Sequence, residues 1–344
     1  MKFVYIATTR FPTERAHGIQ IAKMCEAFSE EGIMVEVLVS RKISSDPFAY
    51  YGIKKNFSVQ KLFSIDLVRF GRIGFWIQSF IFTIFVVIYA VRQSDETLYY
   101  SRDELPLLAL NRLGKKVVWE VHSGRNNIFI RSLVRKEIKM VSISHGLKIF
   151  YLSLGQRPEN ILVAHDGVDI AKFNINVSQE EARNKLSLSG DSKIALYTGS
   201  TYGWKGVSTL QSAATLMDDV QVLIISNKPP FEIPLYLKSA DVLVLPNSAK
   251  EEISRLYTSP LKLFEYMASG VPIVSSDLPS IREVLNDSMA NFFIPDDPID
   301  LTRAIKYTLS HQDEARNKAK VALQEVKKYT WQNRAKMIMD FVLY

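Results

Sequence analysis

The sequence predicts an α/β protein made of two doubly wound halves, each with a parallel sheet covered by helices on both faces. Strands alternate with helices along the chain, and a polar, turn-rich stretch at residues 166 to 192 separates two such alternations. Most of the strands are near-continuous apolar runs, which is typical of strands buried on both faces. A length of 344 residues suits about two domains with cores of their own.

The first half opens with an apolar strand, KFVYIA, followed by a polar loop, TTRFPTERAHG, and an amphipathic helix that Gly32 ends. A second strand, MVEVLVS, follows. Further strands are expected at residues 97 to 101, 116 to 122, 140 to 144 and 160 to 165. We assign residues 1 to 170 to a first Rossmann-like domain.

The second half repeats this pattern, and we assign residues 171 to 325 to it. Its predicted strands are KIALYTG, VQVLIIS, ADVLVLP and VPIVSSD, and its predicted helices include VSTLQSAATLM, SPLKLFEYMASG and PSIREVL. Residues 326 to 344 form a terminal helix that we expect to pack back on the first domain. Ligands of such sheets bind beyond the carboxyl ends of the strands, next to helix N-termini.

The overall charge is moderately positive, with a net charge of +7 and a pI of about 9.2. This suits anionic small molecules or an anionic membrane surface. The chain has no Lys/Arg-rich tract, zinc-finger spacing or RNP-like motif, so nucleic acid is not the expected partner. Cys25 is the single cysteine, which fits a reducing cytoplasm. The apolar run before Arg10 is too short for a signal peptide. Oligomeric state is not predicted.

One uncharged segment, residues 73 to 91, just reaches transmembrane length. It contains Gln78, Ser79 and Thr83, and it lies inside the strand–helix alternation of the first domain. A membrane span here would put the two flanks of one domain on opposite sides of a bilayer. We therefore expect a helix that packs on the sheet, with a transmembrane helix as the alternative, and the sequence leaves open whether an exposed face of this helix touches lipid.

The segment TSPLKLFEYMASG, residues 258 to 270, carries two charges in an otherwise apolar pattern. Ser259 is the expected N-cap, Pro260 the first helical residue, and Gly270 the end of the helix. Lys262 then lies in the first turn, where a cation is unfavourable against the helix dipole. A bound phosphate at this helix end would make the position favourable, and the alternative is a solvated surface lysine.

The second charge is Glu265, which shares a helix stripe with Leu261 and Ala268, so that its carboxylate starts beside the core. Burying an unpaired carboxylate is strongly unfavourable. Two vicinal hydroxyls, such as those of a ribose, would satisfy both of its oxygens. The alternative is a structural ion pair with an Arg or Lys.

The run SPLKLFEYMASGVPIVSSDLPSIREVL resembles the signature of retaining glycosyltransferases of family 4, in a subgroup with an SPLKLFEYMA-type variant of the Glu-x7-Glu motif. Other segments fit this family in order over essentially the whole chain: AHGIQIAKMCEAF, WEVHSG, ISHGLK, HDGVDIAKF, TGSTYGWKG and ADVLVLP. The resemblance implies the GT-B fold, in which two Rossmann-like domains face each other across a cleft. The first would hold the acceptor and the second the nucleotide-sugar donor.

The resemblance also implies roles for individual residues. Glu265 matches the family glutamate that binds the donor ribose, and Lys205 matches the lysine that neutralises the donor diphosphate. His122 matches the histidine that reaches the transferred sugar near the reacting carbon. A hydrogen-bonded residue at a strand end is the plain alternative for His122. Gly18 is expected in a loop over the sugar and phosphates, and the neighbouring His17 is a candidate contact to donor or acceptor.

Two positions depart from the family pattern. Tyr257 stands where the first glutamate of the pair is expected, and Ser200 stands where an arginine is expected. We expect Lys262, with Arg255 nearby, to replace the missing positive charge. The remaining residues of the predicted donor site are Gly199, Ser259, Pro260 and Leu261.

The implied reaction moves a sugar from a nucleotide-diphosphate donor, UDP- or GDP-linked, to a hydroxyl of a glycan or lipid-linked acceptor, with retention. A bacterial cell-surface polysaccharide or lipopolysaccharide pathway is the expected context, at the inner face of the cell membrane. No cofactor or metal is expected, because lysines and helix N-termini can stabilise the leaving diphosphate. A catalytically degenerate nucleotide-sugar-binding partner subunit and a nucleotide-sugar epimerase are the alternatives.

Overall fold

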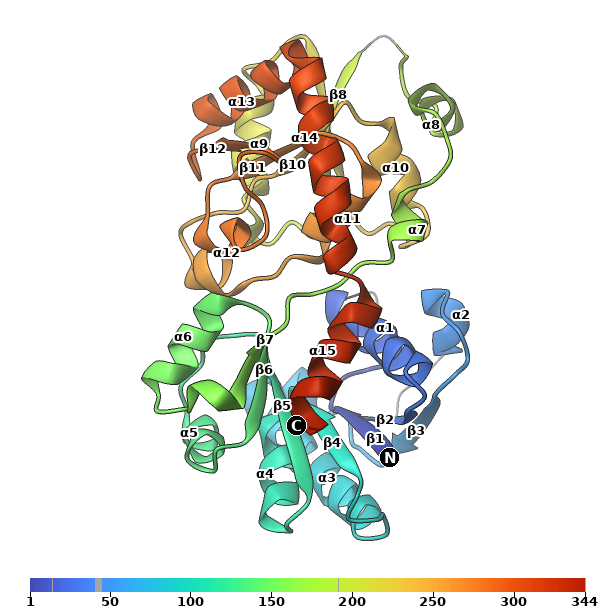
Figure 1. The fold of residues 1–344 in the computed structure, drawn as a ribbon, viewed down its shortest axis with the longest axis vertical. Coiled ribbons are helices and arrows are strands. Elements are labelled where there is room, and N and C mark those ends of the chain that lie inside the picture. Colours follow the sequence, from blue (N-terminus) through green and yellow to red (C-terminus); the bar gives the residue numbers. More distant parts are fainter. Residues whose placement is uncertain (14, 41–44, 191, 344) are drawn as a thin grey trace. The chain divides into compact units, whose positions relative to one another are not determined.

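The computed structural model describes residues 1 to 13, 15 to 40, 45 to 190 and 192 to 343. Internal contacts divide the chain into two compact units (Figure 1). Unit 1 contains Met1–Ile143, Leu147–Ala164 and the segment from Trp331 onward, and unit 2 contains Ser144–Gly146 and His165–Thr330. The division after Ala164 lies slightly before the boundary that the sequence predicts.

Unit 1 is built on a sheet of seven strands in the order β3-β2-β1-β4-β5-β6-β7, and every neighbouring pair is parallel. The strands are β1 (Lys2–Ala7), β2 (Met34–Ser40), β3 (Ser58–Leu62), β4 (Leu98–Ser101), β5 (Lys116–Val121), β6 (Lys139–Ser142) and β7 (Ile161–Val163).

Helices cover both faces of this sheet, because the central strands are apolar on both sides. On one face Val4 and Ile6 pack with Phe82 of α3, and on the other Phe3 stacks on Phe28 of α1 with ring centroids 4.4 Å apart. The helices of unit 1 are α1 (Ala16–Glu30), α2 (Pro47–Tyr51), η1 (Val68–Phe70), α3 (Gly71–Ala90), α4 (Glu104–Arg112), α5 (Ile128–Arg135), η2 (Pro158–Asn160) and α15 (Trp331–Leu343), with α6 (His145–Ser153) beginning in unit 2.

Unit 2 has a parallel sheet of five strands in the order β12-β11-β10-β8-β9. Alternate residues of the strands enter two separate clusters, one packed on α11 and the other on α9 and α13. The strands are β8 (Lys193–Thr198), β9 (Val220–Ile225), β10 (Val242–Leu245), β11 (Ile273–Ser276) and β12 (Asn291–Phe293). The helices are α7 (Ile170–Phe173), α8 (Gln179–Lys185), η3 (Gly203–Lys205), α9 (Val207–Ala214), α10 (Ile233–Ser239), η4 (Ile253–Tyr257), α11 (Leu261–Ser269), α12 (Pro279–Arg282), α13 (Pro298–Ser310), α14 (Gln312–Glu325) and η5 (Val326–Lys328).

The strand order fixes one switch point in each sheet, where the chain changes the direction in which it adds strands. In unit 1 this point lies between β1 and β4, and in unit 2 it lies between β8 and β10. Crevices form outside the carboxyl ends of the strands at such points, and ligands bind there. The predicted fold class, two doubly wound α/β units, is confirmed.

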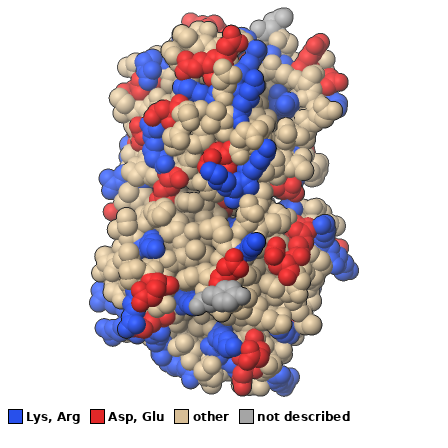
Figure 2. Space-filling model, viewed as in Figure 1, with Lys and Arg blue, Asp and Glu red and all other residues tan. Residues whose placement is uncertain are grey.

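Charged side chains of both signs are interspersed over the face of the molecule shown in Figure 2. This distribution agrees with a moderate net charge of +7 that is spread along the sequence. The charged residues in the two switch-point crevices therefore indicate a binding site more specifically than the net charge does.

Candidate active site

The crevice of unit 2 begins directly after β8. Gly199 follows this strand with φ +121°, a value that side chains rarely adopt, and its N–H donates to Ile225 O at 2.8 Å. A β-carbon at Gly199 would lie 3.0 Å from Lys262 Nζ. Glycine at this position therefore lets the backbone after β8 approach the ammonium of Lys262 closely.

Lys262 lies in the first turn of α11, as the sequence predicts. The predicted cap is wrong by one residue: Pro260 is the N-cap, and the helix begins at Leu261. Ser259 does not cap the helix, because its hydroxyl accepts a hydrogen bond from Asp166 N at 3.0 Å. Ser259 thus ties the start of α11 to the segment that precedes α7.

The ammonium of Lys262 is buried and forms no close ion pair with any of the described residues. The side chain is 8% exposed, and Nζ makes no hydrogen bond to any residue that the structure describes. Nζ lies 3.7 Å from the ring centroid of Tyr197. Burial and the neighbouring charge of Lys205 hold the pKa of Lys262 well below its usual value, although Glu265 raises it. A surface-lysine interpretation of Lys262 is therefore wrong.

Lys205 is the last residue of η3, immediately before Gly206 and α9. Its Nζ lies 3.6 Å from the ring centroid of Trp204, and burial lowers the pKa of Lys205 to about 7. Gly206 has φ +66°, and a β-carbon there would collide with the carbonyl oxygen of Pro246, after β10. Gly206 thereby places Lys205 at the switch point between β8 and β10.

Glu265 is half-buried one turn after Lys262 on α11. Burial raises the pKa of Glu265 to about 7, although Lys172 and Lys262 act in the opposite direction. Within the described part of the chain, Glu265 has no ion pair or hydrogen bond. The structural ion pair that the sequence leaves open as an alternative is not formed by the described residues. A ligand with hydroxyl donors would satisfy this carboxylate.

The other predicted donor-site residues of unit 2 lie around this centre in different environments. Tyr257 is 8% exposed and its hydroxyl is 3.4 Å from Glu252 Oε2. Ser200 is exposed, and its carbonyl accepts from Tyr197 Oη at 2.6 Å. Arg255 is an exposed residue of η4. The contacts bring Lys205, rather than Arg255, next to Lys262.

His122 directly follows β5 in unit 1, and its Nε2 lies 3.1 Å from Glu120 Oε1. Glu120 is 1% exposed and also accepts from Gln20 Nε2 and Arg334 Nη2, both at 2.6 Å. Burial alone would raise the pKa of Glu120, yet Arg334, Arg102 and His122 hold it well below its usual value. The anionic Glu120 therefore fixes the orientation of His122.

The N-terminus of α1 lies beside the switch point of unit 1. The predicted loop position of Gly18 is wrong, because α1 begins at Ala16. A β-carbon at Gly18 would collide with the side chains of Tyr51 and Thr13, so that protein packing explains the glycine. His17 Nε2 lies 3.0 Å from Thr9 Oγ1 and borders a cavity of about 250 Å³. The cavity is also lined by Tyr5, Ile6, Ala7, Thr8, Thr9, Ile21, Arg102 and Asp103.

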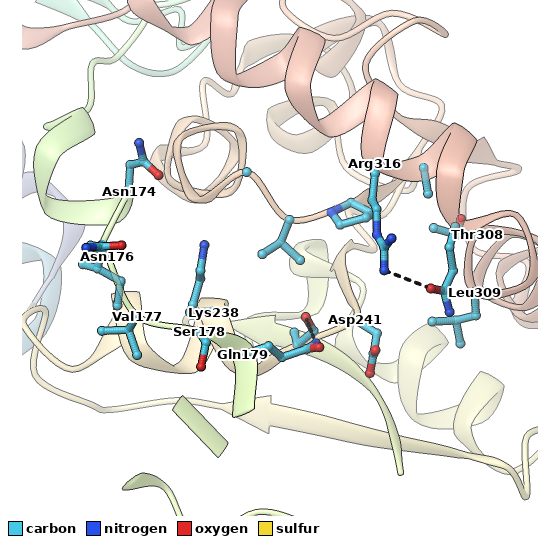
Figure 3. Close-up of a pocket in the computed structure, with 17 residues that line it drawn as sticks. Asn174, Asn176, Val177, Ser178, Gln179, Lys238, Asp241, Thr308, Leu309 and Arg316 are labelled. Atoms are coloured by element: carbon cyan, nitrogen blue, oxygen red, sulfur yellow. Dashed lines mark hydrogen bonds between the residues drawn. The ribbon is translucent and has the colours of Figure 1, made fainter. Parts of the chain in front are cut away.

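Unit 2 also has a larger cavity of about 710 Å³, which lies at the amino ends of its strands (Figure 3). Its lining includes Asp241 and Pro272, which immediately precede β10 and β11. Arg316 borders it and donates to Gln312 Oε1 at 3.2 Å. Because it lies at the amino ends of the strands, this cavity is separate from the lysine-containing crevice.

Sequence reasoning missed three residues that shape these sites: Glu120, Lys172 and Tyr197. A signal existed for Glu120, since an acid inside the apolar run VVWEV implies a buried partner. Lys172 lies in HDGVDIAKF, where it reads as an ordinary exposed residue. Tyr197 reads as strand core, and nothing in the sequence shows that its ring underlies Lys262.

Comparison with known proteins shows similarity to glycosyltransferases. Residues 205 to 311 match the family model of group 1 glycosyl transferases. The D-inositol 3-phosphate glycosyltransferase of Corynebacterium urealyticum is 25% identical over 219 residues, 52% of this chain and 50% of that protein. A phosphatidyl-myo-inositol mannosyltransferase of Mycobacterium tuberculosis is 38% identical over 68 residues, 20% of this chain and 16% of that protein. The chain thus spans half or less of these curated relatives.

Solved structures extend the similarity to the whole fold. Sucrose-phosphate synthase from Thermosynechococcus elongatus superposes with a TM-score of 0.82 at 16% identity, covering 98% of this chain and 97% of that one. Anabaena HepE, solved with UDP and glucose, superposes with a TM-score of 0.75 at 14% identity over 99% and 98% of the two chains. The chain has the GT-B fold of two Rossmann-like units, and residues 205 to 311 of its second unit match the family model of group 1 glycosyl transferases.

Proposed function

We propose that this protein is a retaining glycosyltransferase that takes a nucleotide-diphosphate sugar as donor. The proposal rests on the crevice of unit 2, where the charges of Lys262 and Lys205 act on each other, neither ammonium forms a close ion pair with a described residue, and Glu265 lies one turn after Lys262. Two such ammonium groups suit a diphosphate, and a half-buried carboxylate suits ribose hydroxyls.

The proposed chemistry uses these lysines to stabilise charge as the sugar–phosphate bond breaks. Negative charge develops on the leaving diphosphate, and preorganised cations in a partly dehydrated site stabilise it strongly. Burial lowers the pKa of Lys205 to about 7 in the free protein. A bound diphosphate favours the charged form, so donor binding is accompanied by proton uptake at Lys205. His122 is the proposed contact to the transferred sugar, and no metal or cofactor is required.

Related proteins support the choice of donor and acceptor classes. Anabaena HepE has been solved with UDP and with UDP-glucose. Proteins similar to parts of this chain include a putative teichuronic acid biosynthesis glycosyltransferase of Bacillus subtilis and the amylovoran biosynthesis glycosyltransferase of Erwinia amylovora. We propose a UDP- or GDP-linked donor and a hydroxyl acceptor on a glycan or lipid-linked intermediate of a bacterial surface polysaccharide.

A panel of nucleotide sugars tests this proposal. Thermal shift should select one donor, since a ligand that binds the native state raises its apparent stability. Incubation of that donor with glycan and lipid-linked acceptors should release the nucleoside diphosphate, and NMR of the product should show the anomeric configuration of the donor. EDTA should leave the rate unchanged.

The panel also separates the alternatives. Binding of a donor without turnover by any acceptor would indicate a nucleotide-sugar-binding partner subunit. An altered free donor without release of the nucleoside diphosphate would indicate an epimerase. Absence of any stabilisation by nucleoside diphosphates would contradict the assignment of the lysine-containing crevice itself.

A further inference from the structure

Helix α3 (Gly71–Ala90) buries its few polar residues and exposes many large apolar ones, unlike an ordinary covering helix. Its polar residues Gln78, Ser79 and Thr83 face unit 1 and are buried. Gln78 Oε1 accepts from Leu67 N at 3.2 Å, and Thr83 Oγ1 donates to Ser79 O at 2.7 Å. A helix that covers a sheet normally turns its apolar stripe inward and its polar side outward.

The outward side of α3 is a continuous stripe of large apolar residues. Their spacing of three or four positions puts them on one helix face along its whole length. Their exposed fractions are high for such side chains: Ile73 74%, Ile77 46%, Phe80 62%, Ile84 43% and Ile88 41%, with Val91 59% just beyond the helix.

Neighbouring segments widen this stripe into a surface, which we call the α3 face. Trp76 is 40% exposed and contacts the ring of Phe129 on α5, with centroids 5.3 Å apart. Phe63, after β3, is 43% exposed and lies 5.1 Å from the ring of Phe85. Ile128, the first residue of α5, is 77% exposed. Contiguous apolar surfaces of this kind mark interaction sites.

Arginines stand at both ends of the α3 face. Arg69 and Arg72 are exposed at the start of α3, and Arg92 is exposed after its end. Cations at a helix N-terminus oppose the helix dipole, so Arg69 and Arg72 are not placed there to stabilise the helix. Among the described residues, none of the three arginines has an ion-pair partner. The ends of the α3 face therefore suit anionic groups.

The topology shows how α3 meets such a partner. Its length and composition alone would permit a membrane span. However, the chain enters α3 after β3 and leaves it before β4, and both strands belong to one parallel sheet. Phe82, Val86 and Ala90 anchor the helix in the core of unit 1. The helix thus lies along the unit and presents its side, not its end.

We propose that unit 1 docks on an anionic lipid bilayer through the α3 face, with α3 lying in the plane of the interface. Ile and Phe side chains enter the acyl boundary, Trp76 lies at headgroup depth, and the terminal arginines contact lipid phosphates. This inference does not rest on the proposed donor chemistry. If that chemistry holds, lipid-linked acceptors would share the same surface.

Co-sedimentation of the full chain with vesicles tests the proposal. We expect binding to vesicles of phosphatidylcholine with phosphatidylglycerol, weaker binding to phosphatidylcholine alone, and loss of the difference at high salt. Each of Arg69→Gln, Arg72→Gln and Arg92→Gln should weaken binding about fivefold, the fold-change that corresponds to roughly 1 kcal/mol per basic residue. Equal binding by wild type to both kinds of vesicle, or to neither, would overturn it.

The apolar part of the surface has its own test. Ile73→Ser combined with Phe80→Ser should abolish vesicle binding, and Phe231→Ser in unit 2, at an equally exposed residue (74%), should not. Lipids brominated on the acyl chains should quench Trp76 fluorescence, and Trp76→Phe should remove the quenched component. All variants should keep the unfolding temperature and the nucleotide response of wild type, because these positions are exposed.

A second copy of the chain is the competing occupant of the α3 face. Analytical ultracentrifugation that shows a dimer, dissociated by Ile73→Ser with Phe80→Ser, together with no vesicle binding by wild type, would refute the membrane proposal. Failure of the donor assays with intact vesicle binding would instead contradict only the proposed function.

Discussion

Replacing Lys262 by methionine should stabilise the free protein and weaken donor binding at the same time. Lys262 is 8% exposed, and its buried ammonium lacks a described hydrogen-bond partner and is repelled by Lys205. Methionine is unbranched and only one atom shorter than lysine, and it carries no charge. Substituting buried charges by apolar side chains commonly raises the free energy of unfolding by about 1–4 kcal/mol. A hydrogen bond to a charged group contributes about 1.5–3 kcal/mol, so affinity for the nucleoside diphosphate should fall about 10- to 150-fold.

Denaturant unfolding and isothermal titration calorimetry measure the two effects. The gain in stability should shrink as the pH rises toward about 10. At that pH Lys262 is deprotonated in the unfolded protein as well as in the folded one, so that burying it no longer costs the free energy of a buried charge. Lys320→Met, an exposed lysine of α14 in the same unit, is the matched control and should change neither quantity. A Lys262→Met protein that is less stable than wild type, or that binds the diphosphate equally well, would refute the reasoning.

Three further predictions concern the same two sites. Glu265→Gln should lower affinity for UDP about tenfold or more in calorimetry but leave affinity for inorganic pyrophosphate unchanged, and an equal loss for both would contradict ribose recognition. The pKa of Glu265 is raised to about 7 by burial, so its contribution to the unfolding free energy is complete below about pH 4.5 and is lost as pH rises through 7; denaturant titrations of Glu265→Gln should lack that decline. Arg334→Met should lower the unfolding free energy by about 3–5 kcal/mol, because Glu120 is then buried without its nearest cation. Adding Glu120→Gln should recover much of this loss. An Arg334→Met protein with the unfolding free energy of wild type would contradict the proposed ion-pair network.

Local sequence patterns were sufficient for the central elements of the fold. β1, β8 and β10 are near-continuous apolar runs because they are buried on both faces. The edge strands β3 and β12 were not predicted. β3 reads SVQKL and is largely exposed, while β12 has only three residues. β3 and β12 are strands because they pair with a neighbouring strand, whereas the edge strands β7 and β9 have apolar runs of their own and were predicted.

The residues of the candidate site could be predicted where a charged side chain interrupts a local apolar pattern. Lys262 and Glu265 conflict with the apolar stripe of α11, and this conflict is visible in the sequence. The role of Gly18 was not predictable, because the side chain that leaves no room for a β-carbon there, Tyr51, belongs to a different element. The partners of Glu120 are equally remote. Arg334 is 214 residues away and could not be paired with it by any local pattern.

That remote pairing also bears on how the protein is made. The strands of unit 1 leave the ribosome first, yet Glu120 must wait for Arg334 before its buried charge is compensated. Unit 1 should therefore remain incompletely folded during translation of the whole of unit 2. A chimera that exchanges unit 2 with a relative would have to keep α15 from the parent of unit 1, since this helix completes unit 1.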